Sequence, residues 1–278
     1  MMSSRKLCTG FMYTHSEWRN YWEGTLKRDN GNIGSVTTQS VMWYGVYGIS
    51  SRWNVMASVP YIWTKASRGT LTGMEDLQDL MVAAKYRLVQ SNAGGGTVKA
   101  FLVGAVTTPL TDYSPDFLPL SIGLQSTTIG GRFTLNYTYS KWYVNGSAGY
   151  AWRENVTLDR DAYFTDGRHF STNEVQMPNL FDFNVNAGYN ANGLQAEVFF
   201  AQQNTLGGGD IRRHDMPFVS NRMNAQRIGA LVAWFLPRWQ NVSVRVSGNY
   251  VVQGRNMGEA TSFLAGVLYT FNFNKGDE

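Results

Sequence analysis

Residues 79–88 alternate strictly along the chain, and this alternation limits what they can form. One face is apolar to its end and consists of Leu80, Val82, Ala84, Tyr86 and Leu88. The opposite face carries three charges, Asp79, Lys85 and Arg87. A period of two indicates a β-strand, because successive side chains point to opposite faces. The apolar face is then either the core side of a water-soluble sandwich or the lipid side of an outer-membrane barrel.

The same alternation recurs from end to end. Clear runs occupy residues 53–64, 132–139, 144–152, 181–189, 194–200, 242–250 and 263–273. Weaker alternation marks residues 7–18, 34–49, 97–107 and 226–235. The first of these can extend to Lys27, and the D-N-G-N stretch at 29–32 is then expected to form its hairpin turn. We predict about twelve strands of roughly the 9–11 residues that a transmembrane strand needs.

The lengths of the connections separate the two alternatives. Short turns are expected at residues 49–52, 91–96, 140–141, 190–193 and 236–240. Long polar connections are expected at residues 65–76, 108–125, 153–178 and 205–222. Short periplasmic turns that alternate with long extracellular loops are typical of an up-and-down barrel, and an even strand number places both termini on the periplasmic side. A Greek-key sandwich has no reason to show this pattern.

Composition favours the same fold. Only 16% of the residues are charged, against about 25% in an average soluble domain. No run of 18 apolar residues is present, which excludes a transmembrane helix but not a barrel. Aromatic residues, 14% of the chain, gather near the ends of apolar faces, as interfacial girdles would. The aromatic ending at 268–273 resembles the C-terminal strand that outer-membrane assembly machinery recognises, although the tail at 274–278 follows it.

Several classes of function are disfavoured. Cys8 is the single cysteine, so an internal disulfide and a cysteine-based metal site are excluded, and we expect no metal or cofactor. The net charge of +4 comes without a Lys/Arg run, so nucleic acid is not an expected partner. The first residues lack the apolar stretch of a signal peptide, so either the protein is cytosolic or the numbering begins at a mature or engineered N-terminus, and a barrel requires the second.

Three motifs between residues 34 and 139 resemble a known family. They are Y-G-V-Y-G-I-S-S-R-W-N-V-M-A-S-V-P-Y-I at 44–62, D-L-M-V-A-A-K-Y-R-L at 79–88 and T-T-P-L at 107–110. In this order they resemble the barrel family of MetA-pathway of phenol degradation transporters. Gln78 and Leu110 stand where that family has glycine. The resemblance implies an outer-membrane barrel that admits hydrophobic or aromatic compounds.

The face opposite the apolar one carries the candidate site residues. We predict that eight of them line the barrel lumen: Asp79, Lys85, Arg87, Lys99, Arg132, Asp182, Glu197 and Arg245. Arg227 is a further candidate. Charges in such an interior must pair or be hydrated. They therefore form either a paired ladder that holds the barrel in shape or a cation-rich pore lining. Asp79 and Lys85 are too far apart on one strand to pair, whereas Arg87 and Arg132 can meet Asp182 and Glu197 across the lumen.

Two other features allow more than one interpretation. Pro60 removes a ladder donor from a strand, so a bulge or a rim position is expected there. It indicates either local shape or a lateral opening toward lipid. His169 and Ser171, with Asn173 nearby, have a spacing found in hydrolases, and His214 lies between two aspartates. Both histidines are in polar loops that fix no catalytic geometry, so we predict that the protein is not an enzyme.

Together these features predict an all-β protein. We expect residues 1–278 to form one up-and-down antiparallel transmembrane β-barrel in a bacterial outer membrane. The expected function is passive passage of small, hydrophobic or aromatic molecules, with loops 108–125 and 153–178 as lids. The alternative is a non-conducting accessory barrel that docks on a larger outer-membrane complex. The expected partners are outer-membrane lipid or lipopolysaccharide, a small-molecule solute and, in the alternative, a partner protein.

Overall fold

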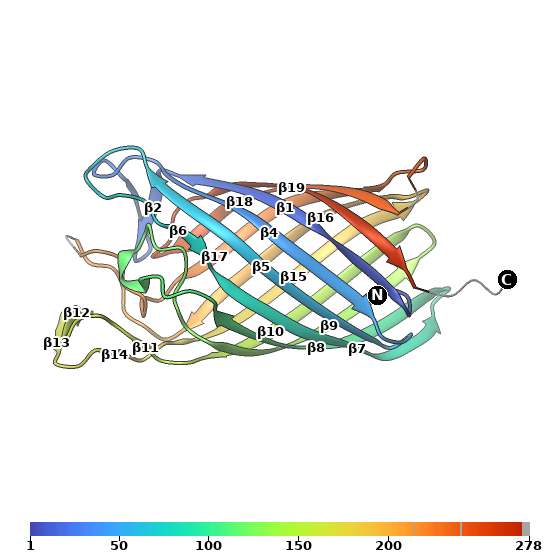
Figure 1. Cartoon of the computed structure of the whole chain (residues 1–278), viewed down its shortest axis with the longest axis horizontal. Coiled ribbons are helices and arrows are strands. Elements are labelled where there is room, and N and C mark those ends of the chain that lie inside the picture. The colour runs from blue at the N-terminus through green and yellow to red at the C-terminus, as the bar shows by residue number, and fades with distance from the viewer. Residues whose placement is uncertain (214, 240, 274–278) are drawn as a thin grey trace.

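The alternating stretches form long antiparallel strands (Figure 1). The computed structural model describes residues 1–213, 215–239 and 241–273. Its long strands are β1 (Lys6–Trp18), β4 (Val36–Gly48), β5 (Trp53–Ala66), β7 (Asp79–Ala93), β8 (Gly96–Pro109), β9 (Thr128–Tyr139), β10 (Trp142–Arg153), β15 (Asn179–Ala191), β16 (Leu194–Leu206), β17 (Asn224–Phe235), β18 (Val242–Arg255) and β19 (Thr261–Asn272). They have 12 to 15 residues each, more than the roughly 9–11 expected.

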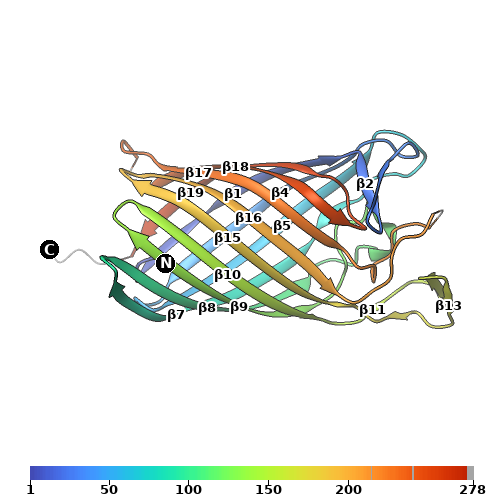
Figure 2. The same cartoon turned by 180° about the vertical axis from the view of Figure 1, so that it is seen from behind.

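The strands close into a barrel. The main sheet has 13 strands, of which β6 (Glu75–Leu77) is a three-residue extension beside β5, so twelve form the wall. Each strand pairs with its neighbours in the chain, and the pairing of β1 with β19 completes the ring. The predicted fold class is therefore confirmed: an all-β, up-and-down, antiparallel barrel. Figure 2 shows the same uninterrupted wall from behind.

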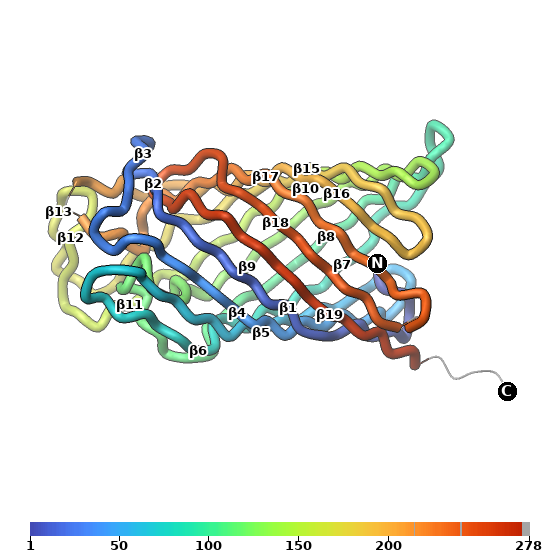
Figure 3. The backbone as a smooth tube through the Cα atoms, turned by 90° about the horizontal axis from the view of Figure 1, so that it is seen from above, coloured from blue at the N-terminus to red at the C-terminus, as the bar shows by residue number. Residues whose placement is uncertain are grey.

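The two ends of the barrel differ. β1 begins and β19 ends at the same end, where the short turns lie (Figure 1). Three of these turns use left-handed backbone, at Gly94 and Gly95, at Ser140, and at Asn192 and Gly193. Gln240 of the predicted turn 236–240 lies outside the described residues. The long connections gather at the other end, as the tube in Figure 3 shows.

The first loop departs from expectation. β1 ends at Trp18, and residues 20–29 form a separate hairpin of β2 (Asn20–Glu23) and β3 (Leu26–Asp29). Its turn is at Gly24, which has a φ of 56°. The prediction that β1 extends to Lys27 and turns at residues 29–32 is therefore wrong. The hairpin is separate because Trp22 turns into the barrel mouth and packs there against Ala225 and Val251.

The outer surface of the wall is apolar. Strongly exposed side chains on it include Phe11, Val198, Phe263 and Val267, at 55–62% exposure. Exposed aromatic residues concentrate at strand ends, with Trp53, Trp142 and Trp234 at the turn end and Tyr150 and Trp152 toward the loop end. A water-soluble protein would bury such a surface, so it must face lipid. Within the described residues, no helix has the length and hydrophobicity to cross a membrane.

Pro60 marks an irregularity in the wall. The pairing of β5 with β7 ends at Ser58 and Met81, and pairing resumes with β6 at Tyr61 and Leu77. Two residues of β5 are thus opposed by three residues of the neighbouring chain. This is the bulge expected where proline removes a ladder donor.

Candidate functional site

An ion pair crosses the inner face of the barrel. The Arg132 guanidinium on β9 lies 2.5 Å from the Asp182 carboxylate on β15, which confirms the predicted contact between them. β10 lies between these strands, and its Gly149 is in register with both residues. A Cβ at position 149 would come within 2.9 Å of Asp182 Oδ2, so glycine leaves the path for the pair open. The two side chains are 39% and 23% exposed, and this exposure is to the interior because their strand neighbours Phe133 and Phe181 face outward.

A second polar contact repeats this arrangement closer to the turn end. Tyr143 on β10 donates its hydroxyl to Glu197 on β16 at 2.6 Å. The contact passes over Gly188 of β15, where a Cβ would come within 2.5 Å of the tyrosine ring and hydroxyl. Asn186 also donates to the Glu197 carboxylate at 2.8 Å. Glu197 is therefore held by hydrogen-bond donors and by no cation in the described part of the chain.

The remaining cations of the predicted set have different surroundings. Lys85 Nζ lies 4.5 Å from the centre of the Phe101 ring. Arg87 Nη1 donates to Gln90 Oε1 at 2.6 Å, so the prediction that Arg87 meets Asp182 or Glu197 is wrong. Its strand is too far round the wall from β15 and β16. Arg245 Nε is buried without a hydrogen-bond partner among the described residues.

Asp79 lies at the outer mouth, at the start of β7. Its carboxylate accepts a hydrogen bond of 2.6 Å from the hydroxyl of Tyr113, which lies in the loop between β8 and β9. Burial and this contact with Asp79 raise the pKa of Tyr113 well above its usual range. The bulge at Pro60 brings the Asp79 side chain to the inner face, because the extra residue shifts the alternation by one between Leu77 and Met81. Asp79 thus anchors a loop and is not close to the other seven predicted residues.

Packed loops cover the mouth. The loop between β8 and β9 buries Leu120, whose carbonyl accepts a 2.6 Å hydrogen bond from Thr64. The loop between β10 and β15 contributes to an apolar cluster with the loop between β16 and β17: Val156, Leu158, Tyr163, Val175, Met177, Phe218 and Val219. Trp22 from the first loop enters the mouth from the other side. We call these four loops the cap.

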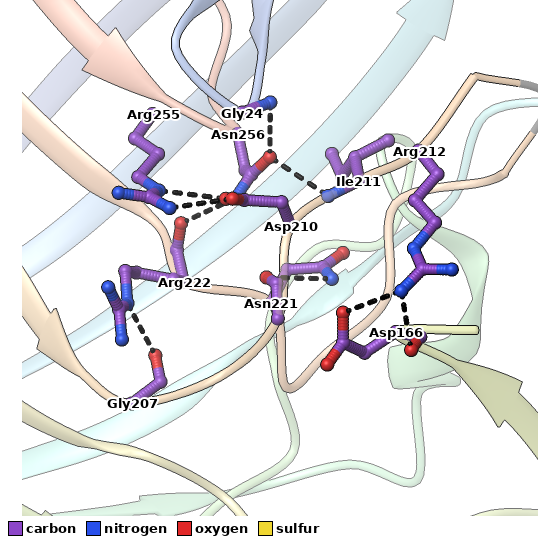
Figure 4. A network of polar contacts seen from close by, with 11 residues as sticks. Gly24, Asp166, Gly207, Asp210, Ile211, Arg212, Asn221, Arg222, Arg255 and Asn256 are labelled. Atoms are coloured by element: carbon purple, nitrogen blue, oxygen red, sulfur yellow. Dashed lines mark hydrogen bonds and ion pairs between the residues drawn. The ribbon is translucent and has the colours of Figure 1, made fainter. Parts of the chain in front are cut away.

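A polar network joins the cap to the wall (Figure 4). Asp210, in the loop between β16 and β17, accepts hydrogen bonds of 2.8 and 2.6 Å from the Arg255 guanidinium at the end of β18. Asn256 lies at its centre: it donates to Asp210 at 2.8 Å and accepts from the backbone of Gly24 at 2.8 Å and of Ile211 at 3.0 Å. Three loops that are distant in sequence are therefore held at one point.

Two carboxylates of the loops are electrostatically stabilised. The Arg255 hydrogen bond, together with Asn256, lowers the pKa of Asp210 against the opposing effect of burial. Burial alone would raise the pKa of Glu259, but hydrogen bonds from Lys27, Tyr250 and Asn20 outweigh it and lower that pKa to about 2. Lys27 Nζ lies 2.5 Å from Glu259, so this contact fastens the first hairpin to the loop between β18 and β19.

A small cavity of about 240 Å³ opens between the loops of the cap. Aromatic and apolar side chains line part of it, including Trp18, Tyr21, Ile33 and Met216. Its size suits a molecule of one ring, and its mixed lining suits a solute with a polar group.

The histidine and serine candidates are not assembled into a site. His169 lies on β13 (Arg168–Phe170), a strand of the exposed hairpin that β12 (Tyr163–Thr165) completes. That hairpin projects from the barrel beyond β11 (Val156–Thr157) and β14 (Glu174–Val175) (Figure 1). Within the described residues no hydrogen bond joins His169 to Ser171. His214 lies outside the described residues.

The alternation pattern did not reveal several residues that organise the interior. Tyr143 is an aromatic residue in phase with the polar Asn145 and Ser147, and Tyr113 and Asn256 lie in loops. Gly149 and Gly188 carry a usable signal, since each interrupts the inner face of a strand beside polar residues.

The apolar outer face, the polar inner face and the even number of antiparallel strands define a transmembrane β-barrel, whose place is the bacterial outer membrane. The chain belongs to the family described as "Putative MetA-pathway of phenol degradation", whose model matches residues 32–265. The resemblance seen in residues 34–139 thus extends over most of the chain.

Solved structures share this fold. The COG4313 outer membrane channel from Pseudomonas putida F1 superimposes with a TM-score of 0.74 and 12% identity, over 98% of this chain and 97% of that chain. The translocator domain of the autotransporter NalP from Neisseria meningitidis gives a TM-score of 0.50 and 10% identity, over 97% and 90%. No curated protein matches the chain.

Proposed function

We propose that this barrel is a channel through which small hydrophobic molecules, aromatic ones among them, cross the outer membrane passively. The observation that carries this proposal is the accessible inner face: Arg132 and Asp182 form an ion pair inside the wall and remain 39% and 23% exposed. An interior filled by side chains would bury them. The family's connection with phenol degradation and the description of the Pseudomonas putida relative as a channel support the same function.

The predicted lumen residues belong to this proposal. Arg132, Asp182, Glu197 and the cations of β7 and β8 would line the passage below the cap. The cavity beside Trp18 and Tyr21 would take up the solute at the mouth. Passage requires no covalent step, so we propose transport without catalysis.

A second candidate is a non-conducting accessory barrel that docks on a partner protein in a larger complex. The cap favours it, because the apolar cluster that includes Val156 and Phe218 gives the outer loops a packed shape suited to protein contact. A closed cap and a polar interior would then serve only to stabilise the barrel.

Blocking the lumen separates the two candidates. Asn184→Trp places a large side chain on the inner face of β15, and Val185→Trp places it on the adjacent, lipid-facing position, which is exposed in the structure. The variants are expressed in porin-deficient Gram-negative cells, and uptake of the hydrophobic dye N-phenylnaphthylamine is measured by fluorescence. Step currents are recorded from the purified barrels in planar bilayers.

A channel predicts dye uptake and current for the wild type and for Val185→Trp, and loss of both for Asn184→Trp. The channel function is contradicted if cells with each of the three proteins take up no more dye than cells without the barrel and the bilayers show no current. Co-purification of a stable partner in that case would support the accessory barrel.

A further inference from the structure

Three cations gather on the inner face of two neighbouring strands. Lys85 and Arg87 lie two residues apart on β7, and β8 places Lys99 in register with Gln90 of β7. The pairing shifts between Arg87 and Val89, so Leu88 and Val89 both face outward and Gln90 returns to the inner face. Arg87 lies between the other two cations: it is two residues from Lys85, about 6.6–6.8 Å along the strand, and Lys99 is two residues and one strand spacing of about 4.8 Å away from it. The long side chains of Lys85 and Lys99 would therefore extend toward Arg87 to reach one small anion.

In the part of the chain that the structure describes, no carboxylate neutralises any of the three. Among the described residues no ion pair joins Lys85, Arg87 or Lys99 to a carboxylate. Lys85 contacts the Phe101 ring, and Arg87 contacts a neutral amide, Gln90.

The carboxylates on the inner face are already engaged elsewhere. Asp182 pairs with Arg132, Glu197 accepts from Tyr143 and Asn186, and Asp79 accepts from Tyr113. A group of cations inside a membrane barrel is costly unless an anion or water compensates it. Within the described residues these three cations therefore have no compensating carboxylate, and a bound anion would supply the missing negative charge.

The surroundings of the cations favour an anion with an apolar body. Phe101 is in register with Arg87, and Val103 is in register with Lys85. An apolar ring or chain can lie along this strip of β8 while its charged group meets the three cations. A guanidinium and two ammonium groups suit a carboxylate, which accepts charge-assisted hydrogen bonds from both.

We propose that Lys85, Arg87 and Lys99 bind the carboxylate of a small hydrophobic acid, such as an aromatic acid, inside the barrel. This rests on the proposed channel function and names the substrate class of that channel. Hydrophobic acids would then be preferred over neutral compounds of the same size.

The test measures binding, so that it does not depend on transport. The full-length barrel in lipid nanodiscs is titrated with 4-fluorobenzoate and with 4-fluorobenzyl alcohol, and binding is followed by ¹⁹F NMR. The triple variant Lys85→Gln, Arg87→Gln, Lys99→Gln is compared with the control Arg68→Gln, Lys141→Gln, Arg238→Gln. The control removes three exposed cations from loops and turns.

We expect the affinity for 4-fluorobenzoate to fall at least about tenfold in the first triple variant and to be unchanged in the control. Binding of the alcohol should be weak and equal in all three proteins. Lys99→Gln alone should weaken benzoate binding about threefold, which keeps the test usable if the triple variant does not fold.

Two results would overturn the proposal. Benzoate bound equally by wild type and both triple variants would show that the cations are not its site. Displacement of fluorobenzoate by equal concentrations of acetate or inorganic phosphate would show an anion site without preference for an apolar body. If dye uptake persists in either case, the channel function stands and only this inference fails. If the bilayers stay silent while benzoate still binds to the three cations, the anion site stands and the channel function fails.

Discussion

At the scale of single residues, glycine on the inner face lets polar side chains meet across an intervening strand. Arg132 reaches Asp182 over Gly149, and Tyr143 reaches Glu197 over Gly188. A methyl group at either glycine would occupy the path of the contact. The contacts therefore depend on the missing Cβ at these glycines of the middle strand as well as on the two polar partners.

We predict that Gly188→Ala lowers the free energy of unfolding by about 1–3 kcal/mol, the usual cost of overpacking. The added Cβ would lie 2.5 Å from the Tyr143 ring and hydroxyl and 2.7 Å from the Ala196 carbonyl oxygen. Gly149→Ala should cost less, because its closest contact, at 2.9 Å, is to a side-chain oxygen. Urea unfolding of the barrel in lipid vesicles measures both.

Gly146→Ala on β10 is the matched control, since a Cβ there meets nothing within 4 Å. It should leave the unfolding free energy within about 0.5 kcal/mol of the wild type. A Gly188 variant as stable as this control would show that the Tyr143–Glu197 contact can shift without cost.

At the scale of elements, the strands could be predicted and the cap could not. Period two identifies a strand from its own residues, so β5, β10 and β16 followed directly from the pattern. The cap depends on contacts between residues far apart in the chain, such as Asn256 with Gly24 and Lys27 with Glu259. No local pattern encodes these. Alternation also predicts which charges share a face, but their partners depend on the register between strands. The sequence therefore predicts the contact of Arg132 with Asp182 and gives a wrong partner for Arg87.

We predict that acid loosens the first hairpin of the cap. The pKa of Glu259 is lowered to about 2 in the folded barrel, from about 4.3 for an unperturbed glutamate. A lowered pKa contributes stability that is complete above the unfolded value and is lost as the pH falls through the folded value. The contact with Lys27 should therefore hold at pH 5 and weaken between about pH 4 and pH 2.

Pepsin cleavage of residues 19–35 and 256–260 measures this loosening, with each rate divided by the rate for the unfolded chain at the same pH. The wild type should resist at pH 4 and become sensitive near pH 2. Glu259→Gln, which lacks the charge at every pH, should be sensitive already at pH 4. If the variant and the wild type are cleaved alike at pH 4, the ion pair does not hold the hairpin.

At the scale of the whole molecule, the barrel is organised in the opposite sense to a water-soluble protein. Its large apolar side chains face outward, and its ion pair between Arg132 and Asp182 faces inward. Positions on opposite faces of one strand should therefore respond oppositely to a charge. On β16, Val198 faces outward at 62% exposure, whereas Gln203 is in register with Asp182 on the inner face.

Val198→Arg should lower the unfolding free energy in lipid vesicles by about 2–4 kcal/mol, because it places a cation in the hydrocarbon region. Gln203→Arg introduces the same side chain beside the Asp182 carboxylate, in an interior open to water, and should cost less than about 1 kcal/mol. In a soluble sandwich the exposed position would accept arginine freely and the inner one would not. A reversed order of the two costs would therefore contradict the membrane barrel itself, whatever solute it conducts.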